Sequence, residues 1–135
     1  MPVGKTKDSG WQIGVSRTLD HAIDEVWALL VSQRGLAIWL GEGVRLEGRT
    51  GETYTTSDGT TGDVRSFHPR NRIRMTWQPA DWDHESTVQV AVSAAGERTR
   101  MTLHQERLVD ADERERQRAH WKRVADQLAD ELATA

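Results

Sequence analysis

The C-terminal stretch from Asp110 to Ala133 constrains the fold most strongly, because it predicts one long amphipathic helix. Asp110 and Glu113 have the D-x-x-E spacing of a capping box, and no Gly or Pro follows them. A helix of this length spans roughly 36 Å, enough to lie across a whole sheet. Its apolar residues form one stripe, at Trp121, Val124, Ala125, Leu128 and Leu132. That stripe needs an apolar partner, which the preceding sequence must supply.

The overall composition restricts the class of protein. We expect the 135 residues to form one domain over residues 10–135, preceded by a flexible, polar tail over residues 1–9. The chain has no cysteine, which excludes disulfides and thiolate metal sites. Its net charge of −3, with both signs interspersed, gives no basic field for nucleic acid. We find no apolar signal segment and no membrane-spanning apolar run, so we expect a cytoplasmic protein.

The N-terminal half begins with a strand followed by two short helices. Strict alternation of apolar and polar residues over Trp11–Leu19 predicts a half-buried strand. Helical spacing over Ile23–Leu30 then predicts a helix that Asp20 caps and that breaks at Gly35. A second short helix is expected over Leu36–Leu40.

The middle of the chain predicts an antiparallel sheet. Between residues 41 and 62, glycines separate two short candidate strands at Val44–Leu46 and Glu52–Thr55. The clearer strands are Gly62–Phe67, Arg72–Trp77, Ser86–Ala94 and Arg98–Leu108. This makes about seven strands before the long helix, an α+β arrangement.

Alternation along these strands assigns the two faces of the sheet. The apolar face, which must meet the helix, carries Ile73, Met75, Trp77, Val88, Val90, Val92, Met101 and Leu103. The opposite face is expected to be a solvated exterior carrying Arg72, Arg74, Thr76, Thr87, Gln89, Arg98, Arg100, Thr102, His104 and Glu106.

Several motifs, in this order of elements, resemble a known family. They are Asp24-Glu25-Val26-Trp27, Trp39-Leu40, Gly62-Asp63-Val64, Pro69-Arg70-Asn71-Arg72-Ile73, Thr76-Trp77, Arg98-Thr99-Arg100-Met101-Thr102-Leu103 and His120-Trp121. Together they resemble the helix-grip fold of the START and Bet v 1-like (SRPBCC) superfamily, and more narrowly the AHSA1-like family, named after the C-terminal domain of the activator of Hsp90 ATPase. One departure is His120, which stands where relatives often have Gly.

The resemblance implies a curved antiparallel sheet of about six or seven strands wrapped on the long C-terminal helix, with two short helices after the first strand. It also implies a hydrophobic cavity between sheet and helix. Such families mostly bind apolar small molecules, while a minority are cyclases, dehydratases or hydrolases. Fold alone does not transfer function.

Large apolar side chains are the candidates for lining this cavity: Trp39, Phe67, Met75, Trp77, Met101 and Trp121. For each one singly, filling the core is the commoner role. His120 and Tyr54 would orient a ligand by hydrogen bonds. Trp82, in the loop before the strand at residue 86, is expected to flank the cavity mouth.

Catalytic and metal signals are weak in this sequence. Asp81, Asp83, His84 and Glu85 share a loop but match no metal-site spacing, so we predict no metal and no cofactor. We therefore expect non-catalytic binding of a small hydrophobic or amphipathic ligand. Two alternatives stay open. One is a co-chaperone of the Hsp90 type or another protein-interaction module, and the other is a cyclase-, dehydratase- or hydrolase-like enzyme that uses the same cavity with His120 as its acid or base. The sequence leaves open whether the protein is a monomer or a homodimer.

Overall fold

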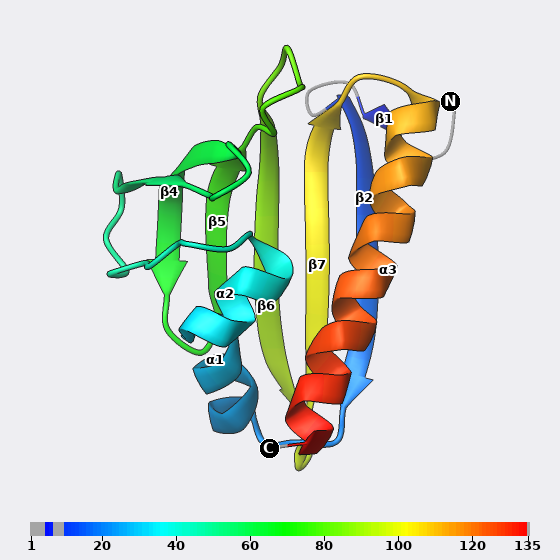
Figure 1. The fold of residues 1–135 in the computed structure, drawn as a ribbon. Coiled ribbons are helices and arrows are strands. Elements are labelled where there is room, and N and C mark those ends of the chain that lie inside the picture. Colours follow the sequence, from blue (N-terminus) through cyan, green and yellow to red (C-terminus); the bar gives the residue numbers. More distant parts are fainter. Residues whose placement is uncertain (1–4, 7–9, 135) are drawn as a thin grey trace.

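The computed structural model describes residues 5–6 and 10–134. In chain order its elements are β1 (Lys5–Thr6), β2 (Gly10–Leu19), α1 (Ile23–Val31), α2 (Gln33–Trp39), β3 (Thr53–Thr55), β4 (Thr61–His68), β5 (Arg72–Trp77), β6 (Ser86–Ala95), β7 (Arg98–Leu108) and α3 (Ala111–Thr134). The strands form one antiparallel sheet in the order β1-β2-β7-β6-β5-β4-β3. Figure 1 shows the helices on one face of this sheet, with α3 lying along β2 and β7.

The predicted helix and strand pattern is largely confirmed. The bounds of β5 and β7 agree with those expected from alternation. The long helix begins as predicted, because the Glu113 backbone N–H donates to Asp110 Oδ1 at 2.7 Å. The Glu113 side chain accepts from the Val109 backbone N–H, one residue before the position that a capping box requires. The apolar stripe of α3 and the apolar face of the sheet are both buried in one core.

The strand predicted at Val44–Leu46 is wrong. Residues 44–47 pair with no strand, and Gly43 and Gly48, which both have positive φ, turn the chain at either end of this segment. Val44 is nevertheless buried in the core. The seventh strand is instead β1, which pairs with β2. It comes from the predicted flexible tail, whose other residues lie outside the described part of the chain.

The ends of the short helices also differ from the prediction. Ala22, rather than Asp20, precedes α1 as its N-cap. The break between the helices falls at Ser32, because its Oγ accepts a hydrogen bond of 3.0 Å from the Gly35 backbone N–H and so starts α2. Gly35 lies inside α2, where a Cβ atom would stand 1.8 Å from the carbonyl oxygen of Leu29. The missing side chain therefore allows α1 and α2 to meet closely.

The outer face of the sheet is less solvated than predicted. Thr76, Thr87 and Glu106 on this face are buried. His104 is half-buried, and its Nε2 lies 3.1 Å from Gln12 Oε1. Long neighbouring side chains cover these positions; Arg74, for example, pairs with Glu106. No helix among the described residues combines the length and apolar character that crossing a bilayer requires.

We predict that Gly35→Ala lowers the free energy of unfolding by about 3 kcal/mol, since the new methyl group meets backbone rather than a flexible side chain. This loss should outweigh the gain of about 1 kcal/mol in helix propensity. Urea denaturation measures it. The matched control is Gly96→Ala, which also adds a methyl group but meets nothing within 4 Å, so only its positive φ should cost about 1 kcal/mol. Equal losses in the two variants would show that the close contact at Gly35 has no energetic importance.

Candidate functional site

The most unusual group in the core is the indole of Trp77, at the end of β5. Its ring centroid lies 5.3 Å from that of Trp82, and 6.2 Å from those of His120 and Trp121. We call these four residues the aromatic cluster. Trp77 Nε1 is buried, and no atom of the described residues accepts a hydrogen bond from it. A buried donor without a partner destabilises the folded protein by about 1–3 kcal/mol. An acceptor that bonded to this N–H would remove that cost.

The loop over residues 78–85 carries Trp82 back onto Trp77. Gln78 Nε2 donates to the Trp82 carbonyl at 2.9 Å, and the Trp82 backbone N–H donates to the Pro79 carbonyl at 3.0 Å. These bonds tighten the loop, so that Trp82 meets Trp77 edge to face. Trp82 is thus half-buried against the core, and its place at the mouth of a cavity stays a prediction.

His84 fastens the same loop to the first turn of α3. Its ring stacks on Trp82, with 4.6 Å between centroids and 13° between planes. Its Nε2 lies 2.8 Å from Oε1 of Glu113, a carboxylate that is only 5% exposed. Burial lowers the pKa of His84, but the hydrogen bonds and charges of Asp83 and Glu113 outweigh this effect and raise it overall. The loop is therefore held by a pair whose strength depends on pH.

A buried amide connects the aromatic cluster to the sheet. Gln105 is completely buried on the inner face of β7. Its Oε1 accepts hydrogen bonds from Trp121 Nε1 at 2.8 Å and from Gln117 Nε2 at 2.9 Å. Its Nε2 donates to Ser86 Oγ at 2.9 Å, and that hydroxyl donates to the Trp77 carbonyl at 2.7 Å. The network joins β5, β6, β7 and α3, and it satisfies the indole of Trp121 while leaving that of Trp77 free.

Sequence reasoning missed these polar partners. A signal for Gln105 exists, because it follows Met101 and Leu103 on the apolar face of its strand, where a polar side chain needs a buried partner. His84 and Glu113 carry no such signal, since they are 29 residues apart and lie in a loop and a helix. Within residues 5–6 and 10–134, no three His, Asp or Glu side chains are arranged to hold a metal ion.

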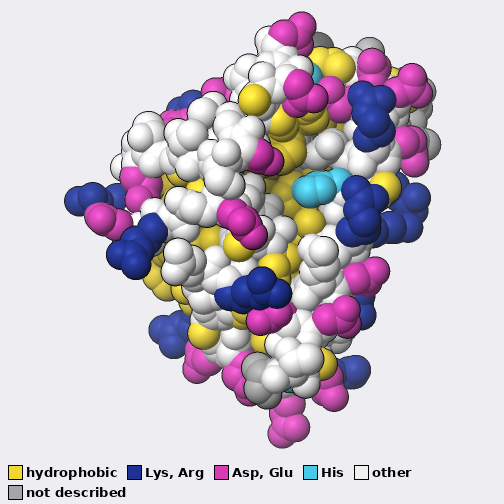
Figure 2. All heavy atoms as spheres, in the orientation of Figure 1, with side chains coloured by type: hydrophobic (Ala, Val, Ile, Leu, Met, Phe, Trp, Pro, Cys, Tyr) yellow, Lys and Arg dark blue, Asp and Glu magenta, His cyan; other side chains and the backbone are white. Residues whose placement is uncertain are grey.

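His120 is the second polar group of the aromatic cluster. It is half-buried, and burial followed by the charge of Arg123 lowers its pKa, so its imidazole is neutral at pH 7. Among the described residues, none hydrogen-bonds to its ring. Its ring packs against those of Trp77 and Trp121, and Figure 2 shows hydrophobic side chains lining a hollow beside α3. The ring can therefore donate at one nitrogen and accept at the other, but no carboxylate orients it as a general base.

The other predicted lining residues lie outside the ring contacts of the aromatic cluster. Met75 and Met101 are fully buried in the core. Trp39 is also buried, and its Nε1 donates to the Leu30 carbonyl at 2.9 Å. Phe67 packs edge to face on Trp27, at 5.8 Å. The Tyr54 hydroxyl donates to the backbone carbonyl of Thr76 at 2.6 Å, and burial raises its pKa. These side chains are engaged in holding the fold.

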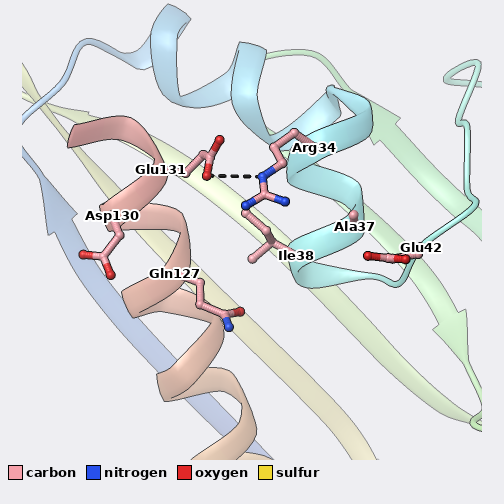
Figure 3. Close-up of a pocket in the computed structure, with 7 residues that line it drawn as sticks. All are labelled: Arg34, Ala37, Ile38, Glu42, Gln127, Asp130 and Glu131. Atoms are coloured by element: carbon pink, nitrogen blue, oxygen red, sulfur yellow. Dashed lines mark ion pairs between the residues drawn. The ribbon is translucent and has the colours of Figure 1, made fainter. Parts of the chain in front are cut away.

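The pockets found in the structure lie elsewhere. Figure 3 shows the pocket between α2 and α3, in which Arg34 points toward Glu131. The volume of this pocket is about 320 Å³, and Arg34 Nε lies 3.2 Å from Glu131 Oε2. Of the predicted lining residues, Tyr54 lines one of the five pockets described here, a hollow of about 380 Å³ beside β3 and β4; the others line none of the five. A ligand cavity between sheet and helix therefore stays a prediction.

Comparison with protein families gives one match, and it covers most of the chain. The model described as activator of Hsp90 ATPase homolog 1-like protein matches residues 20–133. The chain belongs to this family. A comparison with curated protein sequences finds no match.

Solved structures show the fold of this AHSA1-like chain. DynU16, from the dynemicin biosynthetic locus, is 24% identical with a TM-score of 0.77, over 91% of this chain and 47% of its own length. The Aha1 dimer from Colwellia psychrerythraea is 13% identical with a TM-score of 0.73, covering 90% of this chain and 95% of that one. An Hsp90 activator from Plasmodium falciparum is 17% identical with a TM-score of 0.63, covering 76% of each chain. The predicted helix-grip fold is confirmed.

We predict that the His84–Glu113 pair stabilises the AHSA1-like domain more at acid than at alkaline pH. Because its folded-state pKa is raised, the stabilisation is complete below the unfolded value of 6.5 and is lost as the pH rises through the folded value. His84→Gln keeps a neutral hydrogen-bond donor without the charge. The melting temperature of wild type should exceed that of this variant more at pH 6 than at pH 8.5.

His120→Gln provides a control of opposite sign. The pKa of His120 is lowered, so wild type should lose stability relative to this variant as the pH falls below 6.5. A difference between wild type and His84→Gln that stays constant from pH 6 to pH 8.5 would contradict a charged His84–Glu113 pair.

Proposed function

We propose that this AHSA1-like domain binds, without chemical conversion, a small apolar or amphipathic molecule that carries a hydrogen-bond acceptor. The observation that supports this most directly is the buried, unpaired Nε1 of Trp77. Buried polar groups in proteins are nearly always paired, so an orphan donor surrounded by aromatic rings needs an explanation. A ligand carbonyl, ether or phenolate oxygen would supply the missing acceptor.

The rings around Trp77 suit the apolar body of such a ligand. Trp82, His120 and Trp121 present flat surfaces that lose little conformational entropy on binding. Each Å² of apolar ligand surface removed from water contributes about 25 cal/mol. His120, neutral at pH 7 and without a hydrogen-bond partner among the described residues, offers a second polar contact.

Entry to this site requires the loop over residues 78–85 to move, because Trp82 covers Trp77. Beyond its first residue, Gln78, which exchanges two backbone hydrogen bonds with Thr61, the loop is held to the rest of the protein mainly by the His84–Glu113 pair and by the edge-to-face contact of Trp82 with Trp77. Segments held by few interactions open most readily. We therefore propose Trp82 as the cover of the site, and we keep Trp39, Phe67, Met75, Met101 and Tyr54 as predicted wall residues.

A second candidate function is binding to a chaperone of the Hsp90 type. The name of the family favours it, as do the solved structures of an Aha1 dimer and an Hsp90 activator. Those structures are 13% and 17% identical to this chain, so this likeness shows the fold alone and the partner is a proposal. Chaperone binding would use an external surface and would not need the unpaired Trp77 indole.

The test is a ligand screen by tryptophan fluorescence and melting temperature, using fatty acids, sterols, flavonoids and aromatic polyketides. We predict a saturable fluorescence change with one of these classes. At 100 times its dissociation constant the compound should add about 2.7 kcal/mol, which raises the melting temperature by roughly 8 °C. Within the responding class, compounds that have lost the acceptor oxygen should bind about tenfold more weakly.

Two variants locate the binding site. Trp77→Phe removes the orphan N–H and should abolish the preference for acceptor-bearing compounds. Trp27→Phe, which changes a buried indole packed on Phe67, should leave that preference unchanged. If no class of compound stabilises the protein while purified Hsp90 does, the chaperone function replaces the proposed one.

A further inference from the structure

A second pocket lies on the outer face of the sheet, which the helices leave uncovered (Figure 1). Its volume is about 310 Å³, and it spans the strands from β4 to β7. We call it the outer pocket, and it is lined by Arg65, Arg74, Thr76, Glu85, Thr87 and Arg107. It lies on the opposite side of the sheet from the aromatic cluster.

A β-bulge places Arg107 at this pocket. Leu108 pairs with Trp11 and Gln105 pairs with Ile13, so two residues of β7, Glu106 and Arg107, stand opposite one residue of β2. Such a bulge interrupts the alternation of side chains, so that two consecutive side chains point to the same side of the sheet. Arg107 has φ 66°, a left-handed conformation that residues other than Gly seldom adopt. Strained backbone of this kind is concentrated at functional sites.

A second bulge places Arg65 at the other end of the pocket. Val64 pairs with Met75 and Ser66 pairs with Arg74, which leaves Arg65 as the extra residue of β4. Irregular pairing thus brings an arginine to each end of the outer pocket, with Arg74 of β5 between them. Bulges with this effect are conserved design features in many sheets rather than defects.

Two of the three arginines that line the outer pocket form ion pairs, and the third has a guanidinium group that is available to a ligand. Arg74 pairs with Glu106 and lies 3.4 Å from Gln89 Oε1, and Arg65 Nε lies 3.5 Å from an Asp63 carboxylate oxygen. These contacts fix two guanidinium groups and leave some of their five N–H donors unused. Arg107 has no ion pair or hydrogen bond from its side chain among the described residues. Glu85 is the one carboxylate in the lining, against three arginines.

The floor of the outer pocket adds a free hydroxyl. Thr87 is only 7% exposed, and its hydroxyl has no hydrogen-bond partner within the described part of the chain. Thr76, by contrast, exchanges hydrogen bonds with Asp63. The hollow of about 380 Å³ beside β3 and β4 shares Thr76 and Glu85 with the outer pocket, and its other lining residues are mostly threonine and glycine.

We propose that the outer pocket binds the phosphate group of a small, hydroxyl-rich phosphate ester. Arg107, Arg74 and the Thr87 hydroxyl would hold the phosphate oxygens, and the polar remainder would extend into the adjoining hollow. A tetrahedral phosphate offers acceptors in several directions, which suits donors that come from different strands. A single guanidinium group is enough to bind a carboxylate through two parallel hydrogen bonds, so several arginines in one pocket favour a phosphate. This proposal does not depend on the ligand of the aromatic cluster.

Isothermal titration calorimetry with glucose 6-phosphate and inorganic phosphate tests the outer pocket. Wild type should bind both, and glucose 6-phosphate more tightly because its sugar reaches the adjoining hollow. Arg107→Gly removes the guanidinium and suits the positive φ, so binding should weaken about tenfold without loss of melting temperature. Thr87→Val removes the unpaired hydroxyl and should weaken binding about threefold at unchanged stability.

Arg100→Gln is the matched control, because it removes an exposed arginine on the same strand outside the outer pocket. We expect its affinity for glucose 6-phosphate to stay within about twofold of wild type, as for a rim charge screened by salt. The proposal fails if wild type binds neither phosphate compound, or if Arg100→Gln weakens binding as much as Arg107→Gly does. It also fails if Arg107→Gly and Thr87→Val lower the melting temperature and leave affinity unchanged.

Discussion

The hydrogen bonds of the buried Gln105 amide connect the long helix to the sheet, and the rest of the apolar side of the molecule depends on them. Its single carbonyl oxygen accepts from Trp121 and Gln117 of α3, while its amide nitrogen donates to Ser86 of β6. Replacing it with an apolar residue would leave the Trp121 indole N–H buried and unpaired, which should lower the free energy of unfolding by about 1–3 kcal/mol. The same bonds keep the Trp121 indole occupied, whereas the indole N–H of Trp77 is buried without an acceptor among the described residues.

The two faces of the sheet carry different candidate binding groups. On each face these groups lie where the regular alternation of apolar and polar residues is interrupted. On the inner face, a polar residue in an apolar row creates the network beside Trp77. On the outer face, two bulges bring Arg65 and Arg107 to one pocket. Regular alternation alone would give an apolar core and a solvated exterior. The candidate binding groups arise where that pattern is interrupted.

Periodicity predicted the elements in which local pattern and tertiary packing agree. The alternation of β5 and β7 and the capped, amphipathic α3 are examples, since each buries the face that its own sequence makes apolar. The segment between residues 41 and 62 was predicted less well, because glycine conformations set its path and sequence does not reveal the sign of φ. The role of Gly35 depends on a contact between two helices, which no local pattern encodes.

The candidate site was predictable in part for a similar reason. Trp77, Trp82, His120 and Trp121 were identified by residue type, and the structure brings their rings together. Trp39 and Phe67 were named on the same grounds, but each has its own partner elsewhere in the core. The most direct test is an NMR spectrum of the indole N–H groups, with and without a stabilising ligand. We predict a Trp77 signal that shifts downfield on binding, as its N–H gains an acceptor, while the bonded Trp39 and Trp121 signals stay in place. A Trp77 signal that does not move at ligand saturation would contradict binding at this indole.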